Sequence, residues 1–218
     1  MQIITLDFET YYDKQFSLSK ITTEEYIRDP RFEVIGLGVK VGNEETHWLS
    51  GPFEALKTYL HKHYDWENSA VLAHNTLFDG AILSWLFDIH PKLYLDTLCM
   101  ARALHGVEVS GSLKKLAEMY GIGEKGTEIL NAIGKKREDF TEEELSRYGD
   151  YCVNDVELTY ELFSIFMRVF PKQELKVIDL TLRMFIDPVL ELHVDKLENH
   201  LLNLQDQKEK LLDECGLD

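Results

Sequence analysis

The sequence has little cysteine and no long apolar run. Its three cysteines, Cys99, Cys152 and Cys215, show no C-x-x-C spacing. This fits single thiols packed in a core, in a reducing compartment, better than a disulfide framework or a zinc site. No stretch of about 20 apolar residues occurs, and the N-terminus lacks the basic and apolar segments of a signal peptide. The sequence therefore predicts a cytoplasmic protein without a membrane partner.

Basic residues are also in short supply. The chain of 218 residues has 23 lysines and arginines against 39 acidic residues, a formal net charge of −16. Such a charge repels nucleic acid on average, so binding to a phosphate chain needs a local basic patch or metal ions in an acidic pocket. The densest basic cluster is Lys135, Lys136 and Arg137, which either contacts a DNA backbone or lies in a solvated loop. The negative net charge argues against a protein that coats DNA nonspecifically, but it does not argue against a nuclease.

Strand and helix patterns alternate over the first 170 residues. Short β-branched or apolar segments over 2–10, 32–42 and 45–51 predict three neighbouring antiparallel strands. Helices over 52–64 and 77–87 then alternate with strands over 69–75 and 92–97, and helices follow over 96–106, 112–121 and 141–170. Thr141 and Glu144 form a capping-box pattern at the start of the last helix. The order predicts an α/β domain with a mixed sheet flanked by helices, over residues 1–170.

The remaining residues, 171–218, differ in character. They form two helical stretches hinged at Asp187-Pro188, and we expect them to be a C-terminal helical extension. The second stretch runs to Asp218 without a closing cap. It is either the beginning of a larger helical region in a longer parent chain or a terminal helix that frays.

Two carboxylates stand together inside the first strand, in the segment LDFETYY. Side chains of a strand alternate between its faces, so Asp7 and Glu9 share one face while Leu6, Phe8 and Thr10 take the other. Neighbouring carboxylates repel, and one of them is driven toward its protonated form unless a cation neutralises the pair. Either a metal binds there or the strand end is exposed to water.

A second candidate lies in the segment AHNTLFDG, where a strand leads into a helix. Asn75 or Thr76 can cap that helix, and Asp79 can be a first-turn acid favoured by the helix dipole. Strand ends that lead into helices are also where α/β sheets bind ligands. We expect Asp96 to cap the following helix or to support the site, and His74 to be a packing residue with its polar atoms satisfied.

A third candidate lies in the last long helix of the domain. Tyr151 and Asp155 are four residues apart and so share one helix face. Tyr148 shares that face too, and periodicity alone does not say which tyrosine partners the acid. A plain surface hydrogen bond between a tyrosine and the aspartate is an equally simple interpretation.

The combination is more specific than its parts. D-x-E in a first strand, N-x-x-x-D at a strand-to-helix junction and Y-x-x-x-D in a late helix resemble the three exonuclease motifs of the DEDD superfamily, in its tyrosine subclass. The strings LDFET, AHNTLFD, DTLCMARAL, SLKKLAEMYG and YCVNDVELTYELF look most like the proofreading domain of family A (polymerase I type) DNA polymerases, especially phage ones. RMFIDPVLELHVDKL resembles the connection to a polymerase domain. The resemblance, which covers residues 1 to about 170, implies a ribonuclease H-like fold.

The resemblance also implies roles for individual residues. It assigns metal ligation to Asp7, Glu9, Asp79 and Asp155, and orientation of the attacking water to Tyr151. It implies substrate contacts by Thr10, Asn75 and Phe78, the last at a place where many relatives carry tyrosine. Four carboxylates without cysteine or histidine select Mg²⁺ or Mn²⁺, and two such ions about 3.5–4 Å apart can serve phosphodiester cleavage. A phenol with a pKa near 10 suits a neutral group that positions water better than a base.

Three functions follow from this interpretation. The first is a metal-dependent 3′-5′ exonuclease that removes mononucleotides from single-stranded DNA 3′ ends, as the proofreading part of a polymerase, in the host cytoplasm if the chain is phage-encoded. The second keeps the fold and acts on RNA, as ribonuclease D-like relatives do. The third is a catalytically silent module that binds DNA or a polymerase, and the complete set of four acids and a tyrosine argues against it.

Overall fold

The chain divides into two compact units. The computed structural model describes residues 1–124 and 132–216. Contacts between residues group Met1–Asp187 into one unit and Pro188–Asp218 into another. The candidate site lies wholly in the first unit.

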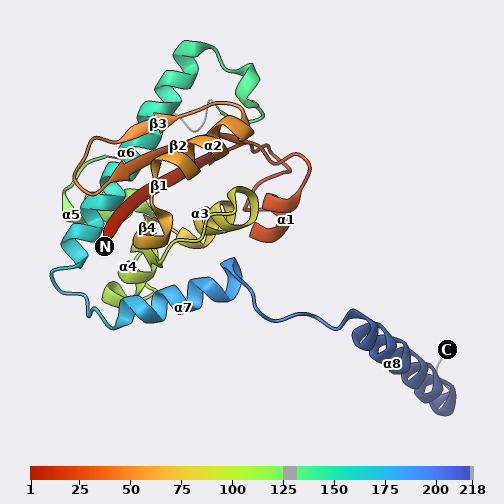
Figure 1. The fold of residues 1–218 in the computed structure, drawn as a ribbon. Helices are drawn as coiled ribbons and strands as arrows, with labels where there is room; N and C mark the ends of the chain where they lie inside the picture. The colour runs from red at the N-terminus through yellow and green to blue at the C-terminus, as the bar shows by residue number, and fades with distance from the viewer. Residues whose placement is uncertain (125–131, 217–218) are drawn as a thin grey trace. The chain divides into compact units, whose positions relative to one another are not determined.

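The first unit is built on a five-stranded sheet (Figure 1). Its strands are β1 (Gln2–Thr10), β2 (Val34–Val41), β3 (His47–Leu49), β4 (Ser69–Ala73) and β5 (Leu93–Asp96), in the spatial order β3-β2-β1-β4-β5. The pairs β1-β2 and β2-β3 are antiparallel, whereas β1-β4 and β4-β5 are parallel. The predicted mixed sheet and the three neighbouring antiparallel strands are confirmed.

Helices cover the sheet. They are α1 (Thr23–Arg28), α2 (Phe53–His63), α3 (Thr76–Ile82), α4 (Thr97–His105), α5 (Leu113–Tyr120), α6 (Glu142–Phe166) and α7 (Glu174–Ile186); α3 continues as a π-helical turn, η2 (Leu83–Phe87), and short 3₁₀ turns lie at η1 (Trp66–Asn68) and η4 (Arg137–Asp139). The Thr141–Glu144 capping box is confirmed at the start of α6. The prediction missed α1, a short helix with its own capping box between Thr22 and Glu25.

Strand alternation sorts the core into two layers. On one face of the sheet, side chains of β1 and β2 pack with α1, α2, α3 and η2. On the opposite face, side chains of β4 and β5 form a cluster with α4, α5 and α6. The first layer includes Leu6, Phe8, Leu37 and Val39; the second includes Ala70, Leu72 and Leu95. The side-chain period of two in a strand makes both faces apolar where helices cover both.

Gly38 of β2 lets α6 approach the sheet closely, and Gly36 lets Trp48 of β3 pack against it. Gly38 and Gly36 lie opposite Asp7 and Glu9 in the β1-β2 pairing. A Cβ on Gly38 would lie 2.9 Å from the Val156 side chain, and 3.1 Å from the sulfur of Cys152 on the same helix. The missing side chain of Gly38 therefore leaves room for α6 beside the Asp7 carboxylate.

The helix α7 belongs with the sheet and protects its β5 edge. The Tyr94 backbone N–H donates to Asp179 Oδ1 at 2.8 Å, and Arg183 Nη2 donates to the Pro91 carbonyl at 2.8 Å. These bonds satisfy groups of an edge strand that would otherwise face water or another chain. The compact unit thus extends to Asp187, while the functional domain boundary at residue 170 stays a prediction.

The second unit contains α8 (Val194–Cys215), in which no side chain is buried. The expectation that this helix runs uncapped to Asp218 is wrong: it ends at Cys215, and Gly216 closes it in a left-handed conformation with φ of 62°. Cys152 is buried as expected, but Cys215 is exposed, so a core role for it is also wrong. Within the described parts of the chain, no helix combines the length and apolar character needed to cross a bilayer.

Candidate active site

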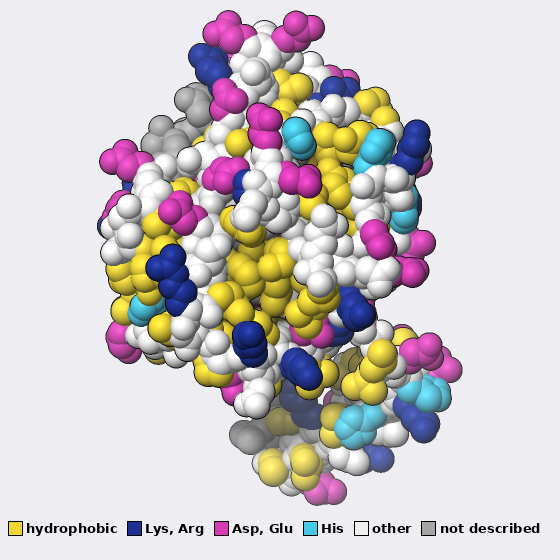
Figure 2. Space-filling view, turned by 60° about the vertical axis from the view of Figure 1, so that its left-hand side comes forward, with side chains coloured by type: hydrophobic (Ala, Val, Ile, Leu, Met, Phe, Trp, Pro, Cys, Tyr) yellow, Lys and Arg dark blue, Asp and Glu magenta, His cyan; other side chains and the backbone are white. Residues whose placement is uncertain are grey.

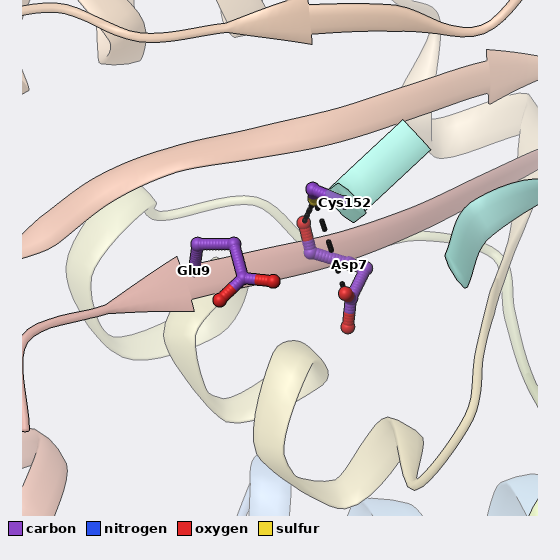
Figure 3. Close-up of side chains that lie close together, drawn as sticks. All are labelled: Asp7, Glu9 and Cys152. Atoms are coloured by element: carbon purple, nitrogen blue, oxygen red, sulfur yellow. Dashed lines mark hydrogen bonds between the residues drawn. The ribbon is translucent and has the colours of Figure 1, made fainter. Parts of the chain in front are cut away.

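The carboxylates of Asp7 and Glu9 lie on the same side of β1 (Figure 3). Together with the Cys152 sulfur they offer ligand atoms that all lie within 4.8 Å of one another. Glu9 is only 7% exposed and Asp7 is half-buried, so the two carboxylates are partly shielded from water. The β1-β2 register shifts directly after Glu9, and such irregularities often redirect side chains next to functional sites.

Cys152 enters the site from α6. Its S–H donates to the Asp7 carbonyl oxygen at 3.3 Å, and the sulfur lies 3.9 Å from Asp7 Oδ2. Burial, followed by the charges of Asp7 and Glu9, raises the pKa of the thiol, so it stays protonated at neutral pH. From the sequence we predicted only a packing role for Cys152. Its place between Tyr151 and Asp155 in the third motif was the signal that could have located it.

Tyr148 contacts the second carboxylate. Its hydroxyl donates to Glu9 Oε2 at 2.5 Å, and the side chain is 2% exposed. Burial, with the charge of Glu9 next, raises the pKa of Tyr148, so the phenol is a neutral donor at neutral pH. Periodicity placed Tyr148 and Tyr151 on the same helix face. Tyr148, which lies outside the Y-x-x-x-D motif, makes the bond to Glu9.

Tyr151 and Asp155 follow on the same face of α6, and both are buried. Burial raises the pKa of the Tyr151 phenol, and the charges of Asp155 and Glu9 raise it further. Tyr151 is therefore protonated and uncharged at neutral pH, and it lies within electrostatic range of carboxylates from both α6 and β1.

Asp79 approaches the same strand from α3. It is 2% exposed, and the Phe8 backbone N–H donates to its Oδ1 at 3.0 Å. Burial raises the pKa of Asp79 well above its ordinary value, and the negative charge of Asp7 raises it further. Asp7 and Asp79 are 72 positions apart in the sequence, and only the family resemblance predicted that they lie close together. The effect of the Asp7 charge on the pKa of Asp79 shows that they do.

The junction between β4 and α3 has an unusual backbone. Asn75 occupies the N-cap position in a left-handed conformation, φ 77° and ψ 52°, and its side chain makes no cap bond. The Thr76 hydroxyl instead bonds the Ala73 and Leu95 carbonyls. Strained non-glycine residues of this kind tend to cluster at ligand-binding positions.

Asp96 supports this junction from the end of β5. Its carboxylate accepts the Cys99 N–H at 3.0 Å, which confirms the expected helix cap, and the Thr76 N–H at 2.9 Å. His74 is also satisfied as expected, with Nδ1 2.8 Å from the Thr97 hydroxyl and Nε2 2.9 Å from the Gly111 carbonyl oxygen. Neither residue is placed as a ligand by these contacts.

Two of the three predicted substrate contacts meet Tyr26 of α1. The Thr10 hydroxyl bonds the Tyr26 hydroxyl at 2.9 Å, and the half-buried Phe78 ring lies 6.0 Å from the Tyr26 ring. The missed helix α1 thus supports this side of the site. Substrate roles for Thr10, Asn75 and Phe78 stay predictions.

The donor set fits a hard divalent cation. Asp7 and Glu9 present neighbouring carboxylates, and Asp79 is buried beside them, an arrangement that is unfavourable without a positive counter-charge. Carboxylate oxygens are the ligands that Mg²⁺ and Mn²⁺ prefer. Asp155 adds a fourth carboxylate, which is buried and is carried by the helix that also supplies Tyr148 and Cys152.

Solved structures share this fold. Brucella melitensis NrnC matches with a TM-score of 0.60 at 14% identity, over 85% of this chain and 82% of that chain. Escherichia coli RNase D, described as an exoribonuclease, matches with a TM-score of 0.54 at 16% identity, over 84% and 45% of the two chains. A family B DNA polymerase from Pyrobaculum calidifontis matches with a TM-score of 0.54 at 14% identity, over 77% and 24%. These likenesses confirm the predicted ribonuclease H-like fold.

Sequence comparison adds the family. No curated protein matches the sequence. A family model described as 3′-5′ exonuclease, however, matches residues 22–170, which is more than half of the chain. That range contains Asp79, Tyr151 and Asp155, while Asp7 and Glu9 precede it and are joined to the others by the fold. The chain therefore belongs to the 3′-5′ exonuclease family.

Proposed function

We propose that this protein is a metal-dependent 3′-5′ exonuclease that acts on single-stranded DNA 3′ ends and releases nucleoside 5′-monophosphates. We further propose that it is the tyrosine-subclass proofreading domain of a phage-type family A DNA polymerase, working in the host cytoplasm. The observation that carries the proposal is the convergence of Asp79 from α3 with Asp7 and Glu9 at the end of β1. Tyr151 and Asp155 on α6 complete the set.

In this proposal Asp7, Glu9, Asp79 and Asp155 hold two divalent metal ions, Mg²⁺ or Mn²⁺. Bound ions of this kind generate a hydroxide-like nucleophile and offset the charge that develops on the phosphate and the leaving oxygen. Tyr151 orients the attacking water as a neutral phenol, in keeping with its raised pKa. The protein's part is to hold the carboxylates in place and to present the water.

The 3′ end of the strand lies against Asn75, Thr10 and Phe78 in this proposal. The strained backbone at Asn75 supports a ligand contact there. Phe78 offers a ring face for stacking and no hydroxyl, so its contribution is apolar. The formal charge of −16 is also unevenly spread: on the face drawn in Figure 2, acidic side chains crowd the upper part, and lysines and arginines lie among hydrophobic side chains below.

The test is digestion of single-stranded DNA labelled at its 5′ end, with Mg²⁺, Mn²⁺ or EDTA. We expect a metal-dependent ladder that shortens from the 3′ end. Asp7→Ala should slow it at least about 100-fold, because metal ions contribute several kcal/mol to such reactions. Glu67→Ala, which removes an exposed acid in η1, is the matched control and should leave the rate unchanged. Normal cleavage by Asp7→Ala would mean that the wrong carboxylates are named.

The second candidate is a 3′-5′ exoribonuclease. It is favoured by the fold shared with RNase D, described as an exoribonuclease, and with NrnC, which has a structure bound to pGG. DNA and RNA oligonucleotides of one sequence, digested side by side, separate the two: faster cleavage of RNA would overturn the choice of DNA. If no metal bound while DNA still bound tightly, the silent binding module would be the better description.

A further inference from the structure

Helix α6 runs along β1, and side chains one helical turn apart on α6 meet side chains two residues apart on β1. Cys152 meets Asp7, and Tyr148, one helical turn earlier, meets Glu9, two strand residues later. Four helix residues advance about 6 Å and two strand residues about 6.7 Å, so the two elements stay in step over this distance. The Tyr148 contact therefore follows from how α6 docks on the sheet.

Packing holds the Tyr148 ring independently of its hydroxyl. The ring stacks on Phe140, with centroids 5.5 Å apart and planes 5° apart, and meets Trp48 edge-on at 6.3 Å. Trp48 in turn occupies space left by Gly149, where a Cβ would lie 2.6 Å from the indole. The phenol oxygen thus has a defined position before Glu9 is considered.

Glu9 needs such a partner more than Asp7 does. A glutamate has one more rotatable bond than an aspartate, and ordering it costs more conformational entropy. A metal ligand has to present its oxygens in one orientation, and groups that bond the ligand from behind set that orientation. A hydrogen bond from a neutral hydroxyl to a carboxylate is among the stronger kinds and is directional.

We propose that Tyr148 is a positioning residue that fixes the Glu9 carboxylate for metal binding, an inference that rests on the proposed function. The Tyr148 hydroxyl sets the orientation of the Glu9 carboxylate, whereas the Tyr148 ring contributes only packing. Tyr148→Phe therefore separates the two roles, since it keeps the ring between Phe140 and Trp48 and removes the donor to Glu9.

The first experiment measures Mn²⁺ binding to the full chain through the paramagnetic resonance signal of free Mn²⁺. We expect Tyr148→Phe to raise the dissociation constant roughly 10-fold to 100-fold, the usual range for loss of a residue behind a ligand. Tyr160→Phe is the matched control, because it removes a hydroxyl that bonds Asn43 on the exposed side of the same helix. It should bind Mn²⁺ as the unaltered protein does.

The second experiment separates positioning from structure. The Mg²⁺ concentration that gives half the maximal rate should rise in Tyr148→Phe by the same factor, with the KM for DNA and the rate at saturating Mg²⁺ unchanged. In EDTA we expect Tyr148→Phe to unfold at a lower temperature than Tyr160→Phe, because it removes a buried hydrogen bond to a carboxylate, so Mn²⁺ binding is measured well below that temperature. In a Glu9→Gln background, Tyr148→Phe should have no further effect on Mn²⁺ binding, which keeps the test valid if the single variant is less stable.

The outcomes separate the two proposals. If the unaltered protein binds Mn²⁺ and Asp7→Ala does not, while Tyr148→Phe binds as tightly as the unaltered protein or more tightly, the positioning role is wrong and the exonuclease proposal stands. A reduced rate at saturating Mg²⁺ with unchanged Mn²⁺ affinity would likewise assign Tyr148 a structural role. If the unaltered protein neither binds Mn²⁺ nor cleaves DNA, both proposals fail.

Discussion

Asp79 shows how one buried side chain links stability to the site. Its pKa is raised by burial and by Asp7, so the folded protein holds the Asp79 proton more tightly than the unfolded chain does. A raised pKa of this kind contributes stability that is complete below the unfolded pKa of about 3.9 and is lost as the pH rises through the folded pKa. At neutral pH without metal, holding this carboxyl group in the folded protein therefore costs free energy relative to the unfolded chain.

Asp79→Asn should relieve this cost, because the amide oxygen can still accept the Phe8 N–H. In EDTA at pH 7 we expect the variant to melt at a higher temperature than the unaltered protein, with a smaller difference at pH 4. Added Mg²⁺ should raise the melting temperature of the unaltered protein more than that of the variant. Scanning calorimetry at both pH values checks this, and a difference that does not depend on pH would contradict it.

At the scale of elements, the contact between α6 and β2 assembles the site. Gly38 stands opposite Asp7, and its missing side chain admits the helix that carries Cys152, whereas Gly36, opposite Glu9, leaves room for Trp48 of β3. The segment IGLGVK reads from the sequence only as a strand interrupted by glycines, which weaken strands in general. The close approach of α6 explains the glycine at position 38, and the packing of Trp48 explains the glycine at position 36.

Gly38→Ala should push α6 away from β1. Its Cβ would lie 2.9 Å from Val156 and 3.1 Å from the Cys152 sulfur, and overpacking of this kind costs about 1–3 kcal/mol. We expect a lower urea midpoint and reduced nuclease activity. Gly51→Ala is the control, because nothing lies within 4 Å of the added Cβ there, and its free energy of unfolding should change by less than about 0.5 kcal/mol. Equal midpoints for the two variants would show that α6 docks less tightly than described.

At the scale of the whole molecule, the two helices after residue 170 differ. From α7, Leu175, Leu182 and Ile186 are buried in the first unit, whereas α8 buries no side chain. Burying a leucine or isoleucine side chain contributes about 1.5–3 kcal/mol to the free energy of unfolding, so the packing of α7 contributes substantially to the stability of the first unit.

A pair of truncations tests this division. A chain that ends at Asp187 should keep the urea midpoint and the nuclease activity of the full chain, because residues 188–216, the described part of what it loses, are all exposed. A chain that ends at Phe170 loses α7 and the bonds to the β5 edge, and we expect it to lose several kcal/mol of stability. If the shorter chain were as stable as the longer one, the boundary predicted at residue 170 would also be the structural one.

The sequence by itself determined the elements, because strand alternation, capping boxes and glycine caps act between residues close in the chain. It placed Asp7 and Glu9 on one face of a strand and Asp155 on one face of a helix. It missed α1, a helix of only six residues, because so short a segment shows little periodicity.

Only the tertiary structure decided which side chains meet. Periodicity put Tyr148 and Tyr151 on the same face, and the docking of α6 on β1 brought the hydroxyl of Tyr148 to Glu9 and the sulfur of Cys152 to Asp7. The packing of α3 against β1 brought Asp79 to the Phe8 backbone and to Asp7, which raised its pKa. The physical reason is distance along the chain: these contacts join residues 71 to 145 positions apart, and their geometry depends on close packing that no local pattern encodes.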